Sequence, residues 1–277
     1  MFSRRTLLQA LAAATSAGAT PPVKIGHREA SMKLIGDVRV FEVASRIPGL
    51  LGVELQVVSG NHDLWSRDIQ RRYKREANKW GMQIPSLSSP FGRGAQLMKP
   101  GAEEAIRKAI VAAEFFGSSV ILVPSFRENC PDIAKPGQVG PVVEMMKRLG
   151  PVAAEAGVAL GLENSLNPAD NAKLIDMIAH PNVRMYFDLD NGEFYGHKNQ
   201  VVPGIKLVGR ERIAQVHVKN EDRLIEQPGS VDWRAAFREL KAIGYDGWYV
   251  LESRHTSEQQ VVDATTRNIR FIKDQLE

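Results

Sequence analysis

The sequence predicts a single-domain α/β protein folded as a closed (β/α)8 barrel, and three observations support this prediction. With 277 residues and 43% hydrophobic content, the chain can bury the core of one large α/β domain. Short apolar runs rich in Val, Ile and Leu recur eight times, mostly without strict alternation, which is typical of strands buried on both faces of a parallel sheet. Amphipathic helical stretches lie between these runs.

The expected elements follow one another in the order that a barrel requires. Strands are expected at residues 23–26, 52–58, 82–87, 120–124, 158–163, 183–188, 213–218 and 248–252. The clearest helices are expected at 63–80, 102–116, 139–156, 171–180, 231–243 and 258–276. Gly81, Gly117, Gly157 and Gly244 suit helix C-caps, and Asp170 is the expected N-cap of the helix at 171–180.

Eight strand–helix units over about 250 residues favour a closed barrel. A doubly wound open sheet is the alternative, but it normally carries a Gly-rich phosphate loop after its first strand, and residues 25–29 do not form one. No linker or low-complexity tract interrupts the chain, so one domain is expected over residues 23–277.

Residues 1–19 have the composition of a secretory signal. Arg4 and Arg5 precede an apolar stretch that is too short to span a bilayer, and small residues follow at 17–19. The paired arginines, with Leu8 after them, resemble a twin-arginine export signal. We therefore expect the twin-arginine translocase as a partner during export, a periplasmic or secreted protein, and no membrane attachment after signal removal. An amphipathic helix on a cytoplasmic protein is the alternative.

Composition narrows the remaining function classes. The formal net charge of +4 is mild, and the basic run at residues 71–75 lies on an expected helix, where a solvated face is favoured over a nucleic-acid site. Cys130 is the only cysteine, which excludes an intramolecular disulfide and a thiolate metal cluster within one chain.

Four strand-like runs in the C-terminal half end on a residue that can bind a metal. Glu163, Asp188, His217 and Glu252 end the fifth to eighth expected strands, roughly 25 to 35 residues apart, and strand ends of a barrel meet on one rim. Taken alone, each of these four residues is explained equally well by a structural role, as a helix N-cap or as a packed residue. Together they predict a hard site suited to Mn(II), Mg(II) or Co(II), with Zn(II) as a further alternative.

The chain resembles the xylose isomerase-like barrel superfamily, specifically its sugar phosphate isomerase/epimerase group, which includes ketose 3-epimerases and inosose dehydratases. The motifs that carry the resemblance are Gly52-Val53-Glu54-Leu55, Leu162-Glu163-Asn164, Phe187-Asp188, Val216-His217-Val218-Lys219, Gly229-Ser230-Val231-Asp232-Trp233, Gly244-Tyr245-Asp246-Gly247 and Leu251-Glu252. The resemblance covers essentially all of residues 23–277 and depends on the order and spacing of these motifs.

The resemblance implies one divalent ion, with Mn(II) favoured, held by Glu163, Asp188, His217 and Glu252. It also implies that Glu163 and Glu252 form a general acid/base pair on opposite faces of a sugar. Further substrate-binding positions are implied at the residues Arg223, Asn191, Lys219 and Glu54. Arg223 is alternatively a solvated loop residue, and Glu54 alternatively braces the barrel. Asn191 stands where the family's epimerases place a histidine, and an amide cannot carry a proton.

The expected function is a metal-dependent sugar isomerase or epimerase that removes a proton next to a carbonyl through a metal-stabilised enediolate. A lyase on the same site, dehydrating an inosose or eliminating from a 3-keto-glycoside, is one alternative, and a non-catalytic sugar-binding barrel is another. The expected partner is a small carbohydrate, free or glycosidic, with no nucleic acid. A homo-oligomer is implied by the resemblance only. Aromatic residues, among them Phe126 and Trp233, line a sugar-stacking pocket or pack the barrel, with packing favoured.

Overall fold

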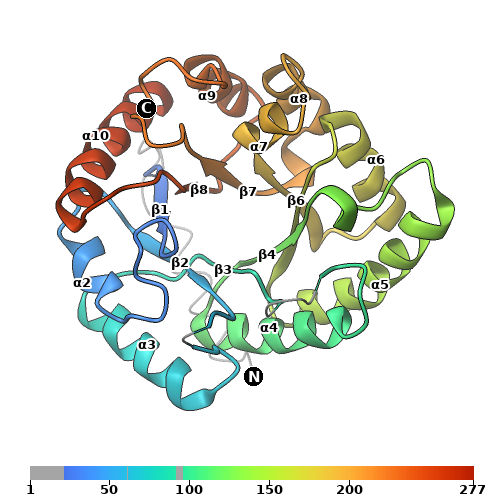
Figure 1. Ribbon diagram of the computed structural model, residues 1–277, viewed down its shortest axis with the longest axis horizontal. Coiled ribbons are helices and arrows are strands. Elements are labelled where there is room, and N and C mark those ends of the chain that lie inside the picture. Colours follow the sequence, from blue (N-terminus) through green and yellow to red (C-terminus); the bar gives the residue numbers. More distant parts are fainter. Residues whose placement is uncertain (1–21, 61, 92–95) are drawn as a thin grey trace, which may run out of the picture.

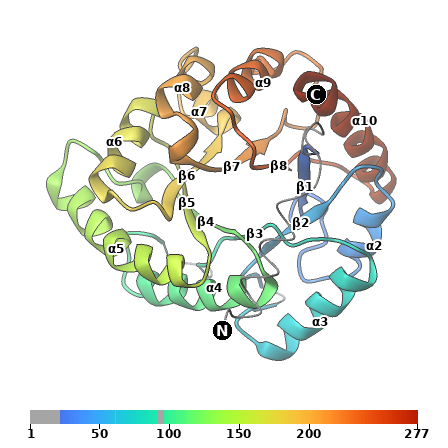
Figure 2. The same ribbon diagram turned by 180° about the vertical axis from the view of Figure 1, so that it is seen from behind.

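The computed structural model describes residues 22–60, 62–91 and 96–277, and it forms a barrel surrounded by helices (Figures 1 and 2). Across these residues, eight parallel strands pair in chain order, and β8 pairs with β1 to close the barrel. The predicted (β/α)8 barrel is therefore confirmed. The expected export signal at 1–19 lies outside the described residues. No helix among those described is both long and apolar enough to cross a membrane.

The strands are short and the helices between them vary in length. The strands are β1 (Lys24–Arg28), β2 (Gly52–Gln56), β3 (Ser86–Ser88), β4 (Val120–Ser125), β5 (Ala159–Asn164), β6 (Val183–Asp188), β7 (Ile213–Val218) and β8 (Trp248–Leu251). The α-helices are α2 (Val40–Ser45), α3 (Arg67–Lys79), α4 (Ala102–Phe116), α5 (Pro136–Glu155), α6 (Pro168–Ile178), α7 (Leu189–Phe194), α8 (Val201–Val208), α9 (Trp233–Ala242) and α10 (Glu258–Leu276).

Most of the expected elements are present, with three differences. The C-cap glycines are confirmed by their left-handed backbone, for example φ +77° at Gly117, where a side chain would be strained. The prediction of Asp170 as an N-cap was wrong. The helix α6 begins at Pro168 and its N-cap is Asn167, whose side chain accepts from the Asp170 N–H. β3 is shorter than expected because Pro85 has no N–H for the ladder. The short helices α2, α7 and α8 were not predicted.

Side chains along each strand alternate between the barrel interior and the helix layer. On β4, Ile121 and Val123 belong to the main core under the helices, whereas Val120 and Leu122 form a small separate cluster with Tyr186. Gly161 makes room for that tyrosine, since a Cβ there would lie 3.1 Å from its ring. The interior is thus filled by side chains, and the chemistry is confined to its rim.

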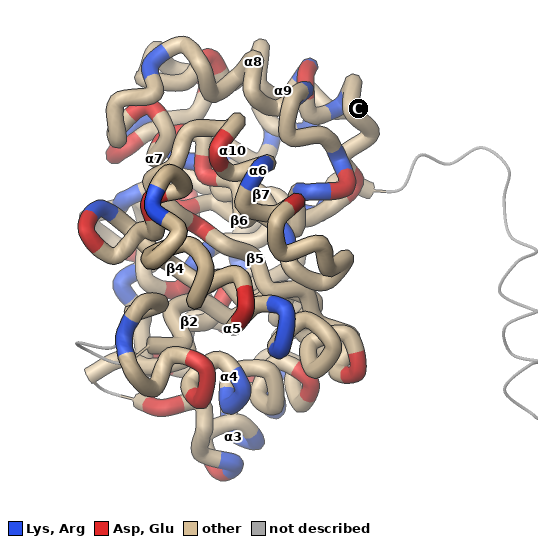
Figure 3. Tube along the Cα trace, turned by 90° about the vertical axis from the view of Figure 1, so that its right-hand side faces the viewer, with Lys and Arg blue, Asp and Glu red and all other residues tan. Residues whose placement is uncertain are grey.

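Charged residues of both signs are interspersed along the outer elements (Figure 3). In the basic run at 71–75, Arg71, Arg72 and Arg75 are exposed on α3, while Tyr73 is buried against the barrel. Arg71 forms an ion pair with Asp68 one turn earlier. The run therefore forms the solvated helix face that the sequence favoured.

Candidate functional site

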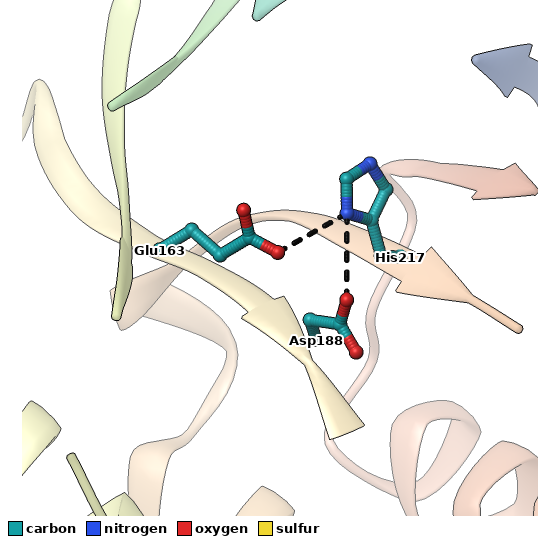
Figure 4. Close-up of side chains that lie close together, drawn as sticks. All are labelled: Glu163, Asp188 and His217. Atoms are coloured by element: carbon teal, nitrogen blue, oxygen red, sulfur yellow. Dashed lines mark hydrogen bonds and ion pairs between the residues drawn. The ribbon is translucent and has the colours of Figure 1, made fainter. Parts of the chain in front are cut away.

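Three of the expected metal ligands form a compact buried group at the C-terminal ends of β5, β6 and β7. One ligand atom each from Glu163, Asp188 and His217 lies within 4.8 Å of the others, and the side chains point toward one another (Figure 4). His217 Nδ1 lies 3.3 Å from a Glu163 oxygen and 3.6 Å from an Asp188 oxygen. Asp188 and His217 are direct partners in the β6–β7 register, which fixes their proximity.

Glu252 joins this group from the end of β8. Its carboxylate oxygen Oε2 lies 3.7 Å from His217 Nδ1. Its backbone N–H donates to the carbonyl of Val218 on β7, so the strand pairing continues through this residue. The structure therefore brings the three predicted carboxylate ligands around one nitrogen of the fourth, His217.

Glu54, on β2, lies fully buried beneath His217. One of its oxygens lies 3.3 Å from His217 Nε2, and the other accepts from the Ser86 and Tyr186 hydroxyls, both at 2.7 Å. The Gln215 amide donates to both of these hydroxyl groups. These contacts link Glu54 to β3, β6 and β7.

Carboxylates face both ring nitrogens of His217 at 3.3 Å, Glu54 at Nε2 and Glu163 at Nδ1. Burial lowers the pKa of this imidazole, but the surrounding carboxylates outweigh burial and raise the pKa well above its usual value. A metal bound at Nδ1 would take the place of the proton there and leave the Nε2–H directed at Glu54. The lone pair on Nδ1 then faces the oxygens of Glu163, Asp188 and Glu252. Four electron-rich atoms facing one another call for a cation between them, as the donor set of a divalent metal site does.

Two cationic side chains enter the cluster. Lys219 Nζ donates to Asp188 Oδ2 at 2.7 Å, to Glu252 Oε2 at 2.8 Å and to Asn191 Oδ1 at 2.9 Å. Arg28, at the end of β1, donates to the other Glu252 oxygen, and its Nε lies 3.7 Å from Glu54. Sequence reasoning missed Arg28, although its place at a strand end was the available signal.

The charges at this rim do not balance within the described part of the chain. The acids are Glu54, Glu163, Asp188 and Glu252, and the lysine and arginine side chains are Lys219 and Arg28. Metal binding at His217 Nδ1 would leave the imidazole neutral, and four ionised carboxylates against the lysine and the arginine would then leave two negative charges. A divalent cation would cancel them, so both the charge and the donor set fit a metal.

The same contacts separate the pKa values of the two glutamates. Burial raises the pKa of Glu163, although His217 opposes this. Burial would also raise the pKa of Glu252, but Arg28, His217 and Lys219 together hold it well below its usual range. Glu163 is thus the carboxyl better able to hold a proton, and Glu252 the one that stays ionised.

The remaining predicted positions differ in their placement. Asn191 lies within the cluster: its Nδ2 donates to Glu163 at 3.0 Å and its backbone N–H to Asp188 at 2.9 Å. Arg223 lies exposed on the loop after β7, where it donates to the Pro228 carbonyl at 2.8 Å. The structure therefore brings together every predicted site residue except Arg223.

A cavity of about 710 Å³ opens above Lys219 and Glu252. Its wall includes Asn191, Phe194 and Tyr195. Trp233, one of the aromatic candidates, is buried and instead donates its indole N–H to the Lys219 carbonyl, so packing was the correct interpretation for this residue.

The model of the xylose isomerase-like TIM barrel family matches residues 41–275. The chain belongs to this family. A search of proteins with curated functions found no match.

Several solved structures share the fold of this chain. One is D-allulose 3-epimerase from Methylomonas sp., with 20% identity and a TM-score of 0.73 over 93% of this chain and 99% of that one. D-psicose 3-epimerase from Clostridium cellulolyticum H10 has 16% identity and a TM-score of 0.76 over 92% and 100%. The 3-keto-D-glucoside 4-epimerase of E. coli has 16% identity and a TM-score of 0.70 over 91% and 99%.

Proposed function

We propose that this protein is a divalent-metal-dependent sugar isomerase or epimerase that transfers a proton at a carbon next to a carbonyl. The observation that carries the proposal is the convergence of Glu163, Asp188, His217 and Glu252 on one rim, with a cavity above them. The names of the structural neighbours, which are sugar epimerases, are consistent with it.

The four converging side chains would hold the metal, and Mn(II) is our first choice because the donors are hard oxygens and one imidazole. When bound, the ion would stabilise the negative charge that develops on the substrate oxygens as a proton leaves the neighbouring carbon. Asn191 and Lys219 hold the ligating carboxylates in place, and the lysine is also placed to donate to a substrate oxygen.

The two glutamates divide the proton transfer. Glu252 stays ionised and takes the proton from the substrate carbon, whereas Glu163 is better able to hold a proton and returns one to the opposite face. Removal from one face and return on the other inverts the stereocentre with no net change in the protons of the substrate. The proton left on Glu252 then returns to Glu163, directly or by exchange with solvent, before the next turnover. Epimerisation would then need no third proton carrier, so an amide at position 191 is compatible with it.

Incubation with a panel of ketoses and 3-keto-glycosides in deuterated water, in the presence of Mn(II), tests this function. Deuterium exchange with no loss of water or aglycone supports epimerisation, whereas an unsaturated product or a released aglycone identifies a lyase on the same site. The Glu163→Gln and Glu252→Gln variants should each lose at least about a hundredfold in rate.

The exposed Glu155 on α5 provides the control, and Glu155→Gln should retain full activity. The metal content of each variant, measured by mass spectrometry, separates a lost ligand from a lost proton carrier. Full turnover in both site variants would show the acid/base assignment to be wrong. A protein that bound sugar but turned over none of the panel would be a binding module.

A further inference from the structure

Phe194 is an apolar side chain left in solvent at the mouth of the cavity. It is 68% exposed, more than any other exposed large hydrophobic residue in the described ranges. It lines the same cavity as Lys219 and Glu252. A phenyl ring gains substantially from burial, so its exposure at a binding cavity indicates an apolar group that covers it when ligand is bound.

The ring is part of an ordered aromatic surface. Tyr195 stacks on Phe126 with ring centroids 5.6 Å apart and an interplanar angle of 18°, and Phe194 meets Tyr195 edge-on at 5.1 Å. The Arg127 guanidinium lies 5.9 Å from the centre of the Phe194 ring. We name the three rings Phe126, Phe194 and Tyr195 the aromatic ledge. It joins the loop after β4 to the end of α7, so two separate elements hold it.

Phe194 and Tyr195 of the ledge line the same cavity as Glu252 of the carboxylate cluster. Asp188 ends β6 and caps α7, and the ledge residues Phe194 and Tyr195 come at the other end of that short helix. The volume of about 710 Å³ is in the range of sites for drug-sized ligands, and larger than a single sugar ring requires. The rest of its wall is strongly polar, with Asp190, Glu221 and Arg254 among its residues. The ledge is thus the apolar part of an otherwise polar cavity wall.

We propose that the aromatic ledge binds a flat apolar aglycone, so that the substrate is a glycoside rather than a free monosaccharide. This inference rests on the proposed function for its sugar half, because the reacting ring is placed over Glu163 and Glu252. The aglycone then extends outward and covers Phe194. Aromatic stacking and burial of the ring provide the affinity, and the polar wall provides none for this group.

Equilibrium binding by titration calorimetry tests the proposal on the full protein with Mn(II) present. The probes are methyl and phenyl glycosides of glucose, galactose and mannose. For at least one sugar, the phenyl glycoside should bind about tenfold more tightly than the methyl glycoside. Phe194→Ala should reduce this ratio to near one, and Phe194→Tyr should restore it. Leu207→Ala is the control, because Leu207 is 54% exposed on α8 and does not line the cavity.

Four results would overturn the inference. The first is equal binding of phenyl and methyl glycosides by the unsubstituted protein for all three sugars. The second is a phenyl preference that survives in Phe194→Ala. The third is a change of oligomeric state in Phe194→Ala with no change in preference, which would make Phe194 a contact between two copies of the chain. Cellobiose binding as tightly as phenyl glucoside would instead indicate a second sugar subsite and also count against an aglycone.

Failure of this inference and failure of the proposed function give different results. A free ketose turned over with no phenyl preference would leave the epimerase intact and remove the ledge. A phenyl preference that depends on Phe194, in a protein that exchanges no substrate hydrogen, would support the ledge and count against the proposed epimerase.

Discussion

Glu29 is a buried carboxyl group outside the carboxylate cluster of the candidate site, and it predicts an unusual pH dependence of stability. It follows β1 and has no exposed surface. One oxygen accepts from the Gln56 N–H at 2.6 Å, and the other has no hydrogen-bond partner. Burial raises its pKa from 4.5 to about 8; Arg28 opposes the shift and Glu54 adds to it. The folded protein therefore holds a proton that the unfolded chain releases.

The sign and size of the effect follow from this difference. For a raised carboxyl pKa, stability is greatest below about pH 4.5 and falls as the pH rises toward 8, because folding must take up a proton. Each pKa unit corresponds to about 1.4 kcal/mol, so Glu29 should lower the free energy of unfolding by about 3 kcal/mol at pH 7 relative to pH 4.

The substitution Glu29→Gln removes the titrating proton and keeps the shape of the group. Urea unfolding followed by circular dichroism at pH 5, 6, 7 and 8 measures the difference in unfolding free energy between the variant and the original protein. Between pH 5 and pH 7, the unfolding free energy of the variant should rise by about 2 kcal/mol relative to that of the original protein. Any constant offset from the buried amide cancels, because only the slope is compared.

Glu155→Gln, on the exposed face of α5, is the matched control and should leave the pH dependence of stability unchanged. A difference for Glu29→Gln that stays constant from pH 5 to pH 8 would mean that this carboxyl ionises normally in the folded state. The physical account of its burial given above would then be wrong.

Three further predictions concern the site, the core and the N-terminus. Lys219→Met should raise the affinity for Mn(II) at least about tenfold by calorimetry, because the ammonium competes with the ion for two carboxylates; weaker binding would mean that Lys219 mainly orders them. Phe237→Ala should lower the unfolding free energy by about 3 to 5 kcal/mol in urea, since the ring is fully buried; a loss below about 1 kcal/mol would contradict its place in the core. Replacing Arg4 and Arg5 by Lys should abolish periplasmic delivery on cell fractionation, and unchanged delivery would refute the export signal.

The barrel could be predicted from the sequence because the apolar runs that indicate its strands are local signals. Apolar runs such as 183–188 and 213–218 coincide with β6 and β7, and their last residues reach the rim because parallel strands share a direction. Glu163, Asp188 and His217 could therefore be placed together without knowing any contact. The missed helices α2, α7 and α8 have six, six and eight residues, too few to show a clear helical period.

The features that could not be predicted depend on contacts between distant residues. Arg28 meets Glu252 across 224 positions of sequence, and Tyr186 meets Glu54 across 132. Nothing near Arg28 in the sequence distinguishes it from an ordinary strand-end residue. The asymmetry between the two glutamates depends on these long-range cations, so it became visible only in three dimensions.

The barrel and the proposed ion depend on each other. Acids buried side by side destabilise a fold unless positive charge meets them, and at this rim Arg28, Lys219 and the His217 imidazole provide it. The closed sheet, in which each strand is paired on both sides, resists the local opening that would relieve the repulsion. A dication that binds only the folded state would stabilise it by about 2.7 kcal/mol at a hundred times its dissociation constant. The proposed ion would therefore gain its affinity from the same closely packed carboxylates that the closed barrel holds together.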